Sequence, residues 1–433
     1  MRSSIWMFAL AFGAGAASAQ QQPQTASRGT AGDTLRLTRR QAIASSLLAS
    51  PQIEIAREQT LQVRAQRVEG ISIPDPVFAL AYDSLSGPLR LGQSSARPAS
   101  VTLAVPFPDK FRLRNRIGVE SIHTSEAQFN QLRQAIASQA ARSYDSVLVT
   151  RLHRRDLMDA RDLAADFLKK TQARFDAGSV ARLDVIKAQV GLAQSENDLI
   201  ANSRDVANAE AAMNRLLGRP LGLPIATLDS LEEPARLPDL DAIEQMALRN
   251  RPELAALEAQ MRGAAANSSL IKEMAILPDL SFSANRDLMV DSGAWWTAGF
   301  SFPIPVFFWQ HTRGDFAETK HRELELAATY RDQRAAVGQD VRAAFSAADA
   351  ALRQVIFIRD QLLPSAREAY RVATVSYGLG RLSALDVLDA RRALVDAQRQ
   401  FADALAAANS ARSDLERAAG VPLTSIAPGA PRE

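Results

Sequence analysis

The stretch Phe175-Asp-Ala-Gly178-Ser-Val-Ala-Arg-Leu183-Asp184-Val185 returns 202 residues later as Tyr377-Gly-Leu-Gly380-Arg-Leu-Ser-Ala-Leu385-Asp386-Val387. The same offset carries Gly218 onto Gly420. A duplication of this length indicates two copies of one structural unit rather than a solenoid of short repeats. We therefore expect a pseudo-symmetric molecule, and pseudo-symmetric units are a natural way to line a ring or a tube.

The duplication divides the chain into two matching parts. We predict repeat 1 over residues 37–222, a linker over 223–236 and repeat 2 over 237–424. Each repeat reads as a helical stretch, two short strand-like runs, a very long helix, a glycine-containing turn and a returning helix. The predicted fold class is therefore mainly α with a small β part, internally duplicated.

The two ends of the chain are typical of an exported protein. A basic start and a short apolar run precede the small residues Ala17-Ser-Ala19, so residues 1–19 are predicted to be a signal peptide. Residues 20–36 and the tail 425–433 are polar or rich in proline and are predicted to be disordered.

The composition excludes several classes of function. The chain has no cysteine, which excludes disulfides, thiolate metal sites and thiol nucleophiles. Its net charge is only +3, with acids and bases interspersed, so nucleic-acid binding has no support. The four histidines are scattered without metal-ligand spacing, and no catalytic or nucleotide-binding fingerprint is present. We predict neither an enzyme nor a bound cofactor or metal.

Very long helices dominate the pattern. Residues 112–177 contain no proline, and no glycine apart from Gly118, while apolar side chains recur at three- and four-residue steps. Such a helix is a rod of about 100 Å, which suits a coiled-coil-like assembly. The second copy, residues 312–377, contains Pro364, which is predicted to kink it. Gly178 and Gly380 are predicted to end the long helices at hairpin tips.

Four short runs alternate between apolar and polar residues, as strands do. They lie at residues 76–82, 101–105, 280–283 and 300–304. Proline cannot donate to a sheet ladder, so the pairs Pro106/Pro108 and Pro303/Pro305 predict where the strands leave the sheet. The aromatic residues at 307–309 fit either a girdle at a membrane interface or the packing of a strand–helix junction.

Two carboxylates follow the second glycine turn. Asp386 and Asp389 are three residues apart, so both are expected on one face of the returning helix. An ordinary acidic first turn, stabilised by the helix dipole, also explains them, and spacing alone favours that interpretation. In repeat 1, Asp184 takes the place of Asp386 and Lys187 that of Asp389.

Two copies of this element order behind an export signal resemble the TolC family of outer-membrane efflux channels. The resemblance covers roughly residues 37–424 and is most specific in the two duplicated segments quoted above. Phe302-Pro-Ile-Pro-Val-Phe307 and Leu362-Leu-Pro364 resemble the heavy-metal efflux branch of the CzcC and CusC kind.

The resemblance implies a homotrimer in the cell outer membrane, whose long antiparallel helices form a periplasmic α-barrel. The strands agree independently, because four per chain cannot close a barrel, whereas three chains supply roughly twelve for a trimeric outer-membrane β-barrel surrounded by lipid. The implied function is passive, gated export of small molecules or metal cations. The implied partners are a periplasmic adaptor protein and an inner-membrane pump of the RND type.

The resemblance also implies roles for residues at the tips. Asp386 and Asp389 match the paired aspartates that ring the periplasmic entrance of these channels. Asp184 and Tyr377 match positions that bond between neighbouring hairpins and hold the entrance shut. Leu382 stands where this latch usually has an arginine, and Arg381 lies one place earlier. The loops that match the adaptor-docking surface are Gly178, Ser179, Val180, Ala181, Gly380, Arg381, Leu382 and Ser383.

A periplasmic coiled-coil adaptor, or membrane fusion protein, is the alternative. Adaptors have one hairpin between two halves of a lipoyl-like domain, whereas this chain has two predicted hairpins and two strand pairs. A purely structural coiled-coil protein would have no reason to contain the strand pairs.

Overall fold

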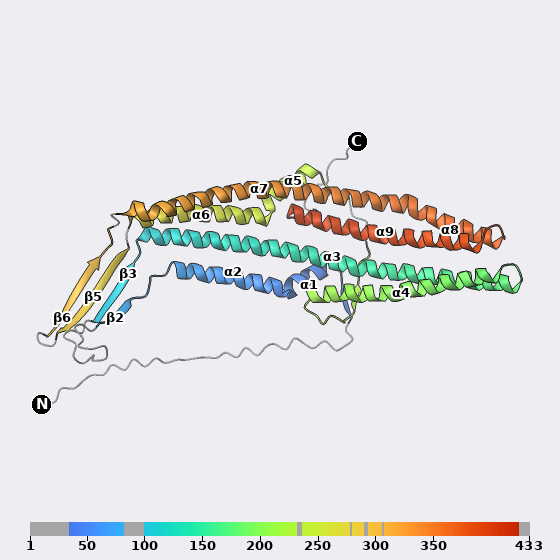
Figure 1. Ribbon diagram of the computed structural model, residues 1–433, viewed down its shortest axis with the longest axis horizontal. Helices are drawn as coiled ribbons and strands as arrows, with labels where there is room; N and C mark the ends of the chain where they lie inside the picture. Colours follow the sequence, from blue (N-terminus) through green and yellow to red (C-terminus); the bar gives the residue numbers. More distant parts are fainter. Residues whose placement is uncertain are drawn as a thin grey trace, which may run out of the picture.

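The computed structural model describes residues 34–81, 99–231, 236–277, 279–289, 293–304 and 307–423. The predicted signal peptide 1–19, the tail 425–433 and Pro305 lie outside these ranges. Figure 1 shows an elongated molecule with a small sheet at one end and two helical hairpin tips at the other.

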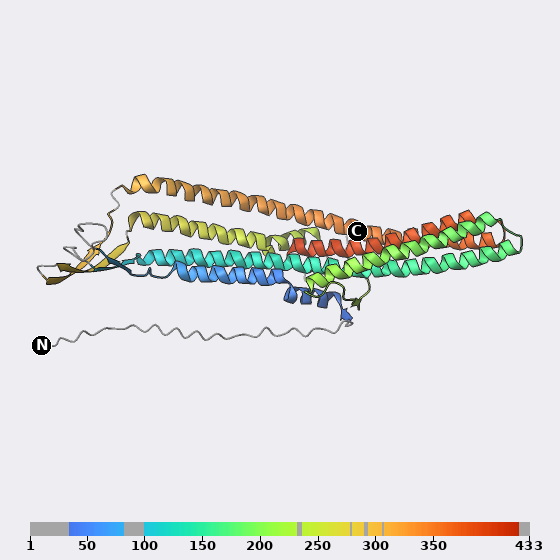
Figure 2. The same ribbon diagram turned by 60° about the horizontal axis from the view of Figure 1, so that its bottom comes forward.

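The helices follow the duplicated order that the sequence predicts. In repeat 1 they are α1 (Arg39–Ala49), α2 (Pro51–Gly70), α3 (Pro108–Asp176) and α4 (Arg182–Leu216). In repeat 2 they are α5 (Leu240–Asn250), α6 (Pro252–Ile276), α7 (Phe308–Phe357), α8 (Leu363–Gly378) and α9 (Ala384–Ala419). The 69 residues of α3 make a rod of about 100 Å. It packs against α2, α4, α6 and α9 and runs along nearly the whole helical part of the molecule (Figure 2).

Proline residues lie at several helix boundaries. The first helical stretch of each repeat is two helices rather than one, because Pro51 and Pro252 each begin a new helix at its first position. The predicted kink at Pro364 takes the form of one π-helical turn, η2 (Ile358–Leu362), between α7 and α8. There the N–H of Leu363 donates to the carbonyl of Ile358, five residues back, so the helix widens before the proline.

Two short strands differ from the sequence expectation. Leu35–Leu37 forms β1, although disorder is predicted over residues 20–36, and Ile225–Thr227 forms β4 inside the predicted linker. The two strands pair in parallel. Leu37 and Ile225 are buried against Tyr144 and Val147 in the middle of α3, and this burial of apolar side chains holds both strands in place.

The four-stranded sheet has the order β2-β3-β5-β6, with every neighbouring pair antiparallel. Its strands are β2 (Val77–Leu80), β3 (Ala99–Val105), β5 (Leu280–Met289) and β6 (Gly293–Ser301). The last strand therefore ends at Ser301 instead of reaching residue 304, and β5 runs longer than the sequence predicts. Pro106 and Pro303 follow the ends of β3 and β6, and Pro108 begins α3.

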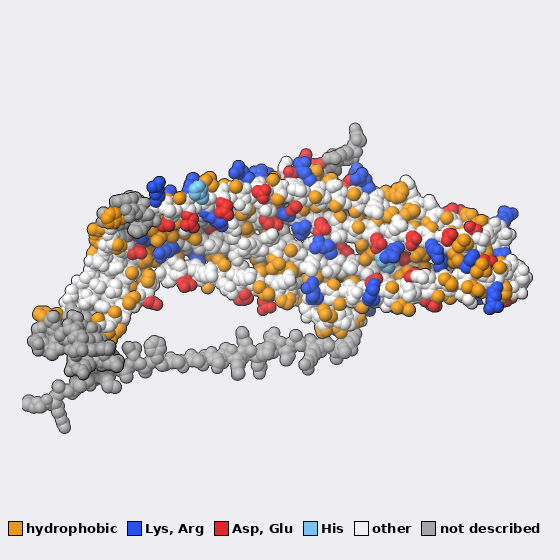
Figure 3. Space-filling view, viewed as in Figure 1, with side chains coloured by type: hydrophobic (Ala, Val, Ile, Leu, Met, Phe, Trp, Pro, Cys, Tyr) orange, Lys and Arg blue, Asp and Glu red, His pale blue; other side chains and the backbone are white. Residues whose placement is uncertain are grey.

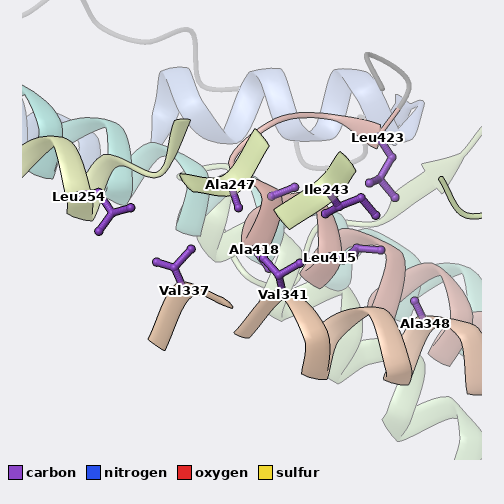
Figure 4. Packing of buried hydrophobic residues seen from close by; sticks show 10 residues of the cluster. Ile243, Ala247, Leu254, Val337, Val341, Ala348, Leu415, Ala418 and Leu423 are labelled. Atoms are coloured by element: carbon purple, nitrogen blue, oxygen red, sulfur yellow. The ribbon is translucent and has the colours of Figure 1, made fainter. Parts of the chain in front are cut away.

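The buried core is distributed along the rod in separate clusters, one of which Figure 4 shows. In that cluster Ile243 and Ala247 of α5 pack with Val337 and Val341 of α7 and with Leu415 of α9. A matching cluster in repeat 1 centres on Tyr144 of α3. Each cluster joins a short helix to two long ones, so the duplicated halves are held by equivalent packing.

Candidate functional site

Both hairpin tips close through the same backbone motif. Gly178 and Gly380 have φ angles of 70° and 72°, in the left-handed region that favours glycine. The N–H of Ser179 donates to the carbonyl of Arg174 at 2.8 Å, and the N–H of Arg381 donates to that of Ser376 at 2.9 Å. These six-to-one bonds define Schellman motifs, so the duplicated glycines end α3 and α8 in the same way.

Tyr377 lies between the two hairpins. Its side chain is only 5% exposed, and its ring centroid lies 5.4 Å from that of Phe167 on α3. The Tyr377 hydroxyl donates to Thr171 Oγ1 at 3.4 Å. The guanidinium carbon of Arg174 lies 4.5 Å from the Tyr377 ring centroid, and Arg174 also donates to the Tyr377 carbonyl oxygen. Tyr377 therefore ties the end of α8 to the end of α3.

Sequence reasoning missed Arg174 and Thr171 as members of this site. Arg174 is a cation in the last turn of α3, where it complements the helix dipole, and that role alone would account for it. Its aromatic partner is 203 residues away in the sequence. No local pattern predicts such a pair. The only signal is the duplication itself, because Arg174 and Tyr377 lie just before the two matching glycine turns.

The other predicted latch residues lie apart from Tyr377. Asp184 is half-buried in the first turn of α4, and Arg381 is exposed at the tip of the second hairpin. Neither side chain makes a hydrogen bond or an ion pair with any described residue. Within one chain, the structure therefore brings Tyr377 to the first hairpin but does not bring the three predicted residues together.

Asp386 has a local structural partner. Its carboxylate accepts hydrogen bonds from the Ser383 hydroxyl at 2.7 Å and from the Ser383 N–H at 2.8 Å, which makes a capping box at the start of α9. These bonds, the side-chain one first, hold the pKa of Asp386 below its usual value. Asp389 is exposed and lies 3.9 Å from Arg392. Val387 and Leu388 between the two aspartates are buried, so both carboxylates lie on the solvent-facing side of α9.

The predicted docking loops are accessible. All of their residues are exposed except Val180, which is half-buried and packs against the cluster around Tyr377. In the described part of the chain, no group of three or more His, Asp or Glu side chains is arranged to hold a metal ion. Nor does any described helix have the length and hydrophobicity that crossing a membrane requires.

The sheet at the opposite end of the molecule has two different faces. Its register places Leu103, Phe282 and Phe300 side by side on one face. The neighbouring positions Thr102, Ser283 and Gly299 share the other face, because side chains alternate along each strand. The ring centroids of Phe282 and Phe300 are 5.3 Å apart. At these positions the first face is thus apolar and the second is polar or small, although Val77 and Trp295 also lie on the second face.

A rod of long antiparallel hairpins with an amphipathic sheet at one end is the architecture of an outer-membrane channel protein. The sequence matches the outer membrane efflux protein family over residues 81–219 and 243–421, so the chain belongs to that family. The chain is an efflux channel of the outer membrane with a helical part in the periplasm, and it is not an adaptor. The TolC-type fold expected from the duplicated segments is confirmed.

Relatives of the chain agree with this assignment. The cobalt-zinc-cadmium resistance protein CzcC of Cupriavidus metallidurans is 23% identical over 340 residues, covering 76% of this chain and 78% of that protein. The pyoverdine export outer membrane protein OpmQ of Pseudomonas aeruginosa is 26% identical over 372 residues, covering 83% and 75%. The crystal structure of CusC superposes with a TM-score of 0.74 at 18% identity, covering 88% and 92%.

Proposed function

We propose that three copies of this chain form the outer-membrane component of a tripartite efflux system. The open sheet carries this proposal. In the described part of the chain, strands β2 and β6 each have a neighbour on one side only, and one face of the sheet is apolar. Unpaired backbone groups in hydrocarbon cost several kcal/mol each, so a membrane-embedded sheet needs its edges paired. Three sheets supply roughly twelve strands, enough to close a barrel.

The proposed partners act at the helical end. The exposed tip loops are suited to contact with a periplasmic adaptor protein, and an inner-membrane pump of the RND type supplies the energy. The channel itself conducts passively when the tips separate. The names of the relatives CzcC and OpmQ cover both metal resistance and small-molecule export, so the proposed cargo is a metal cation or a small molecule.

In this proposal the tips form the gate. Tyr377, held between the hairpins by Thr171 and Arg174, is the centre of the closed-state latch. Asp184 and Arg381, which lack side-chain partners among the described residues, are available to a neighbouring subunit. Asp386 and Asp389 of three subunits would place six carboxylates around the entrance. A carboxylate ring favours cations electrostatically.

The oligomeric state tests the proposal most directly. Protein extracted from outer membranes in detergent should migrate as a particle of three chains, measured by light scattering with correction for bound detergent. Deletion of residues 77–105, which removes β2 and β3, should prevent insertion. A stable monomer in the outer membrane would contradict the proposal.

Single-channel recording tests the gate. Replacing both Asp386 and Asp389 with alanine should lower cation selectivity and weaken block by multivalent cations, because the charge at the entrance is lost. Lys187→Ala, at the position in repeat 1 that matches Asp389, is the control and should not lower cation selectivity. If the double variant inserts normally with unchanged selectivity, the two aspartates only stabilise the first turn of α9.

A further inference from the structure

Among the side chains that the structure describes, a single charged one lies on the apolar face of the sheet. Arg286 of β5 is directly opposite Ala99 of β3 and Trp296 of β6, so it shares the face of Leu103 and Phe282. Every other side chain that the structure describes on this face is apolar. They are Phe78, Leu80, Ala99, Val101, Leu103, Val105, Leu280, Phe282, Ala284, Trp296, Ala298 and Phe300. A charge on such a face is costly unless it reaches water or a counter-charge.

Arg286 has an aromatic partner among the described side chains. Its guanidinium carbon lies 5.5 Å from the ring centroid of Trp296, within the range of a cation–π interaction. Trp296 is itself 73% exposed. No Asp or Glu whose side chain the structure describes forms an ion pair with Arg286. In Figure 3, acidic and basic side chains are mixed along the helices, whereas the visible described part of the sheet is hydrophobic or uncharged.

Arg286 lies in the part of β5 farther from the helices, which is the outer-leaflet side in the proposed barrel. The ion pair between Lys110 and Asp279, at 2.7 Å, marks the helical end of the sheet. Arg286 is seven residues beyond Asp279. Seven strand residues span about 23 Å, or about 16–19 Å along the membrane normal at the usual strand tilt. The apolar band of such barrels is about 25 Å tall, and a long arginine side chain can extend over the remaining distance.

We propose that Arg286 and Trp296 bind the phosphate-bearing headgroup of a lipid in the outer leaflet. The planar guanidinium suits two-pronged recognition of phosphate, and stacking on Trp296 orients it at the interface. The phosphate supplies a counter-charge that no described acidic side chain provides to Arg286. The inference rests on the proposed membrane insertion of the sheet, and a trimer would carry three such sites around its barrel.

Lipid binding to the full-length chain in detergent tests the inference. The probes are a bis-phosphorylated lipid A, the same lipid with both phosphates removed, and inorganic phosphate. Binding of each probe is measured by the shift in the protein's melting temperature and by native mass spectrometry. The wild-type protein should bind the phosphorylated lipid at least about tenfold more tightly than the dephosphorylated one. Inorganic phosphate at millimolar concentration should produce no shift, because the site needs the acyl chains to lie on the apolar face.

Three variants separate lipid recognition from a general effect. Arg286→Gln should abolish the preference for the phosphorylated lipid, and Arg286→Lys should retain part of it. Arg112→Gln, which removes an exposed cation near the start of α3 at the helical end of the sheet, should leave the preference unchanged. If Arg286→Gln inserts normally and still prefers the phosphorylated lipid as strongly as the wild-type protein, the Arg286 side chain is only solvated by water and the inference is wrong. Failure of the wild-type chain to insert would instead contradict the proposed function.

Discussion

The two hairpin tips share a backbone but differ in side-chain chemistry. In repeat 1, α4 follows Ala181, which has no side chain able to cap the helix, whereas in repeat 2, α9 follows Ser383, which forms a capping box. The aromatic residues at matching positions also differ. Phe175 is half-buried at its own tip, while Tyr377 is almost fully buried between the hairpins.

The difference shows how a duplicated unit can specialise. Left-handed glycine geometry is sufficient to close both turns, so the backbone places few demands on the neighbouring side chains. The first tip contributes the receptor groups Arg174 and Thr171, and the second contributes the aromatic ring that they hold. The second tip alone also presents the exposed pair of carboxylates. Two turns with the same backbone therefore form one asymmetric contact between the hairpins, which we call the asymmetric joint: Arg174 and Thr171 from the first tip and Tyr377 from the second.

The largest expected effect comes from removing the ring at the centre of this joint. Tyr377→Ala should destabilise the packing of the tips by about 3–5 kcal/mol, because it empties a buried aromatic site. Phe175→Ala, at the matching but half-buried position, should cost clearly less. Hydrogen exchange of the last turns of α3 and α8 measures both. Equal losses of protection would show that the two tips are energetically equivalent and would contradict the asymmetric joint.

Arg174→Met should have the next largest effect. The variant keeps most of the apolar stem but loses the cation–π contact and the hydrogen bond to the Tyr377 carbonyl, at a cost of about 1–3 kcal/mol. Ser376→Ala, the matching position in repeat 2, is the control and should be nearly neutral. Single-channel recordings should show more frequent opening for Arg174→Met only. If the closed state of Arg174→Met is as stable as that of the wild-type protein, Arg174 does not contribute to holding the channel closed.

A smaller effect is expected at the helix caps. Ser383→Ala should cost about 1 kcal/mol because α9 loses its capping box. The reverse change, Ala181→Ser, places Ser three residues before Asp184 and should stabilise the start of α4 by about 0.5–1 kcal/mol. Hydrogen exchange of the first turns of α4 and α9 measures the pair. A gain at α4 as large as the loss at α9 would make the two tips interchangeable in this respect.

The smallest expected effect is a pH dependence confined to the second tip. Since its bonds to Ser383 lower the pKa of Asp386, this carboxylate stabilises the fold at pH values above the ordinary Asp pKa of about 4. That contribution should be lost as the pH falls through the lower pKa of the folded protein. Carboxyl NMR titration of Asp386 measures this directly. In Ser383→Ala the pKa should return toward the ordinary value, and an unchanged pKa would exclude the capping box as its cause.

Local sequence signals predicted the elements well and their limits less well. Three features were predictable from short stretches of sequence: the proline- and glycine-poor run of α3, the turn glycines and the break near Pro364. Each depends on the backbone conformation of only a few residues. Strand β1 was not predicted because a strand of three residues is too short to show an alternating pattern. It is held by Leu37 packing on Tyr144 of α3, more than 100 residues away in the sequence.

The duplication, the long helices, the hairpin turns and membership of the efflux family all follow from the amino-acid pattern alone. The contacts between residues of the two copies follow only from the way the folded elements pack. The pairing of Tyr377 with Arg174 depends on how the two hairpins pack. Within repeat 2, the register of β5 on β6 places Arg286 beside Trp296. Helix and turn formation depend on interactions over a few residues, whereas contacts between segments 200 residues apart depend on the shape and burial of whole elements.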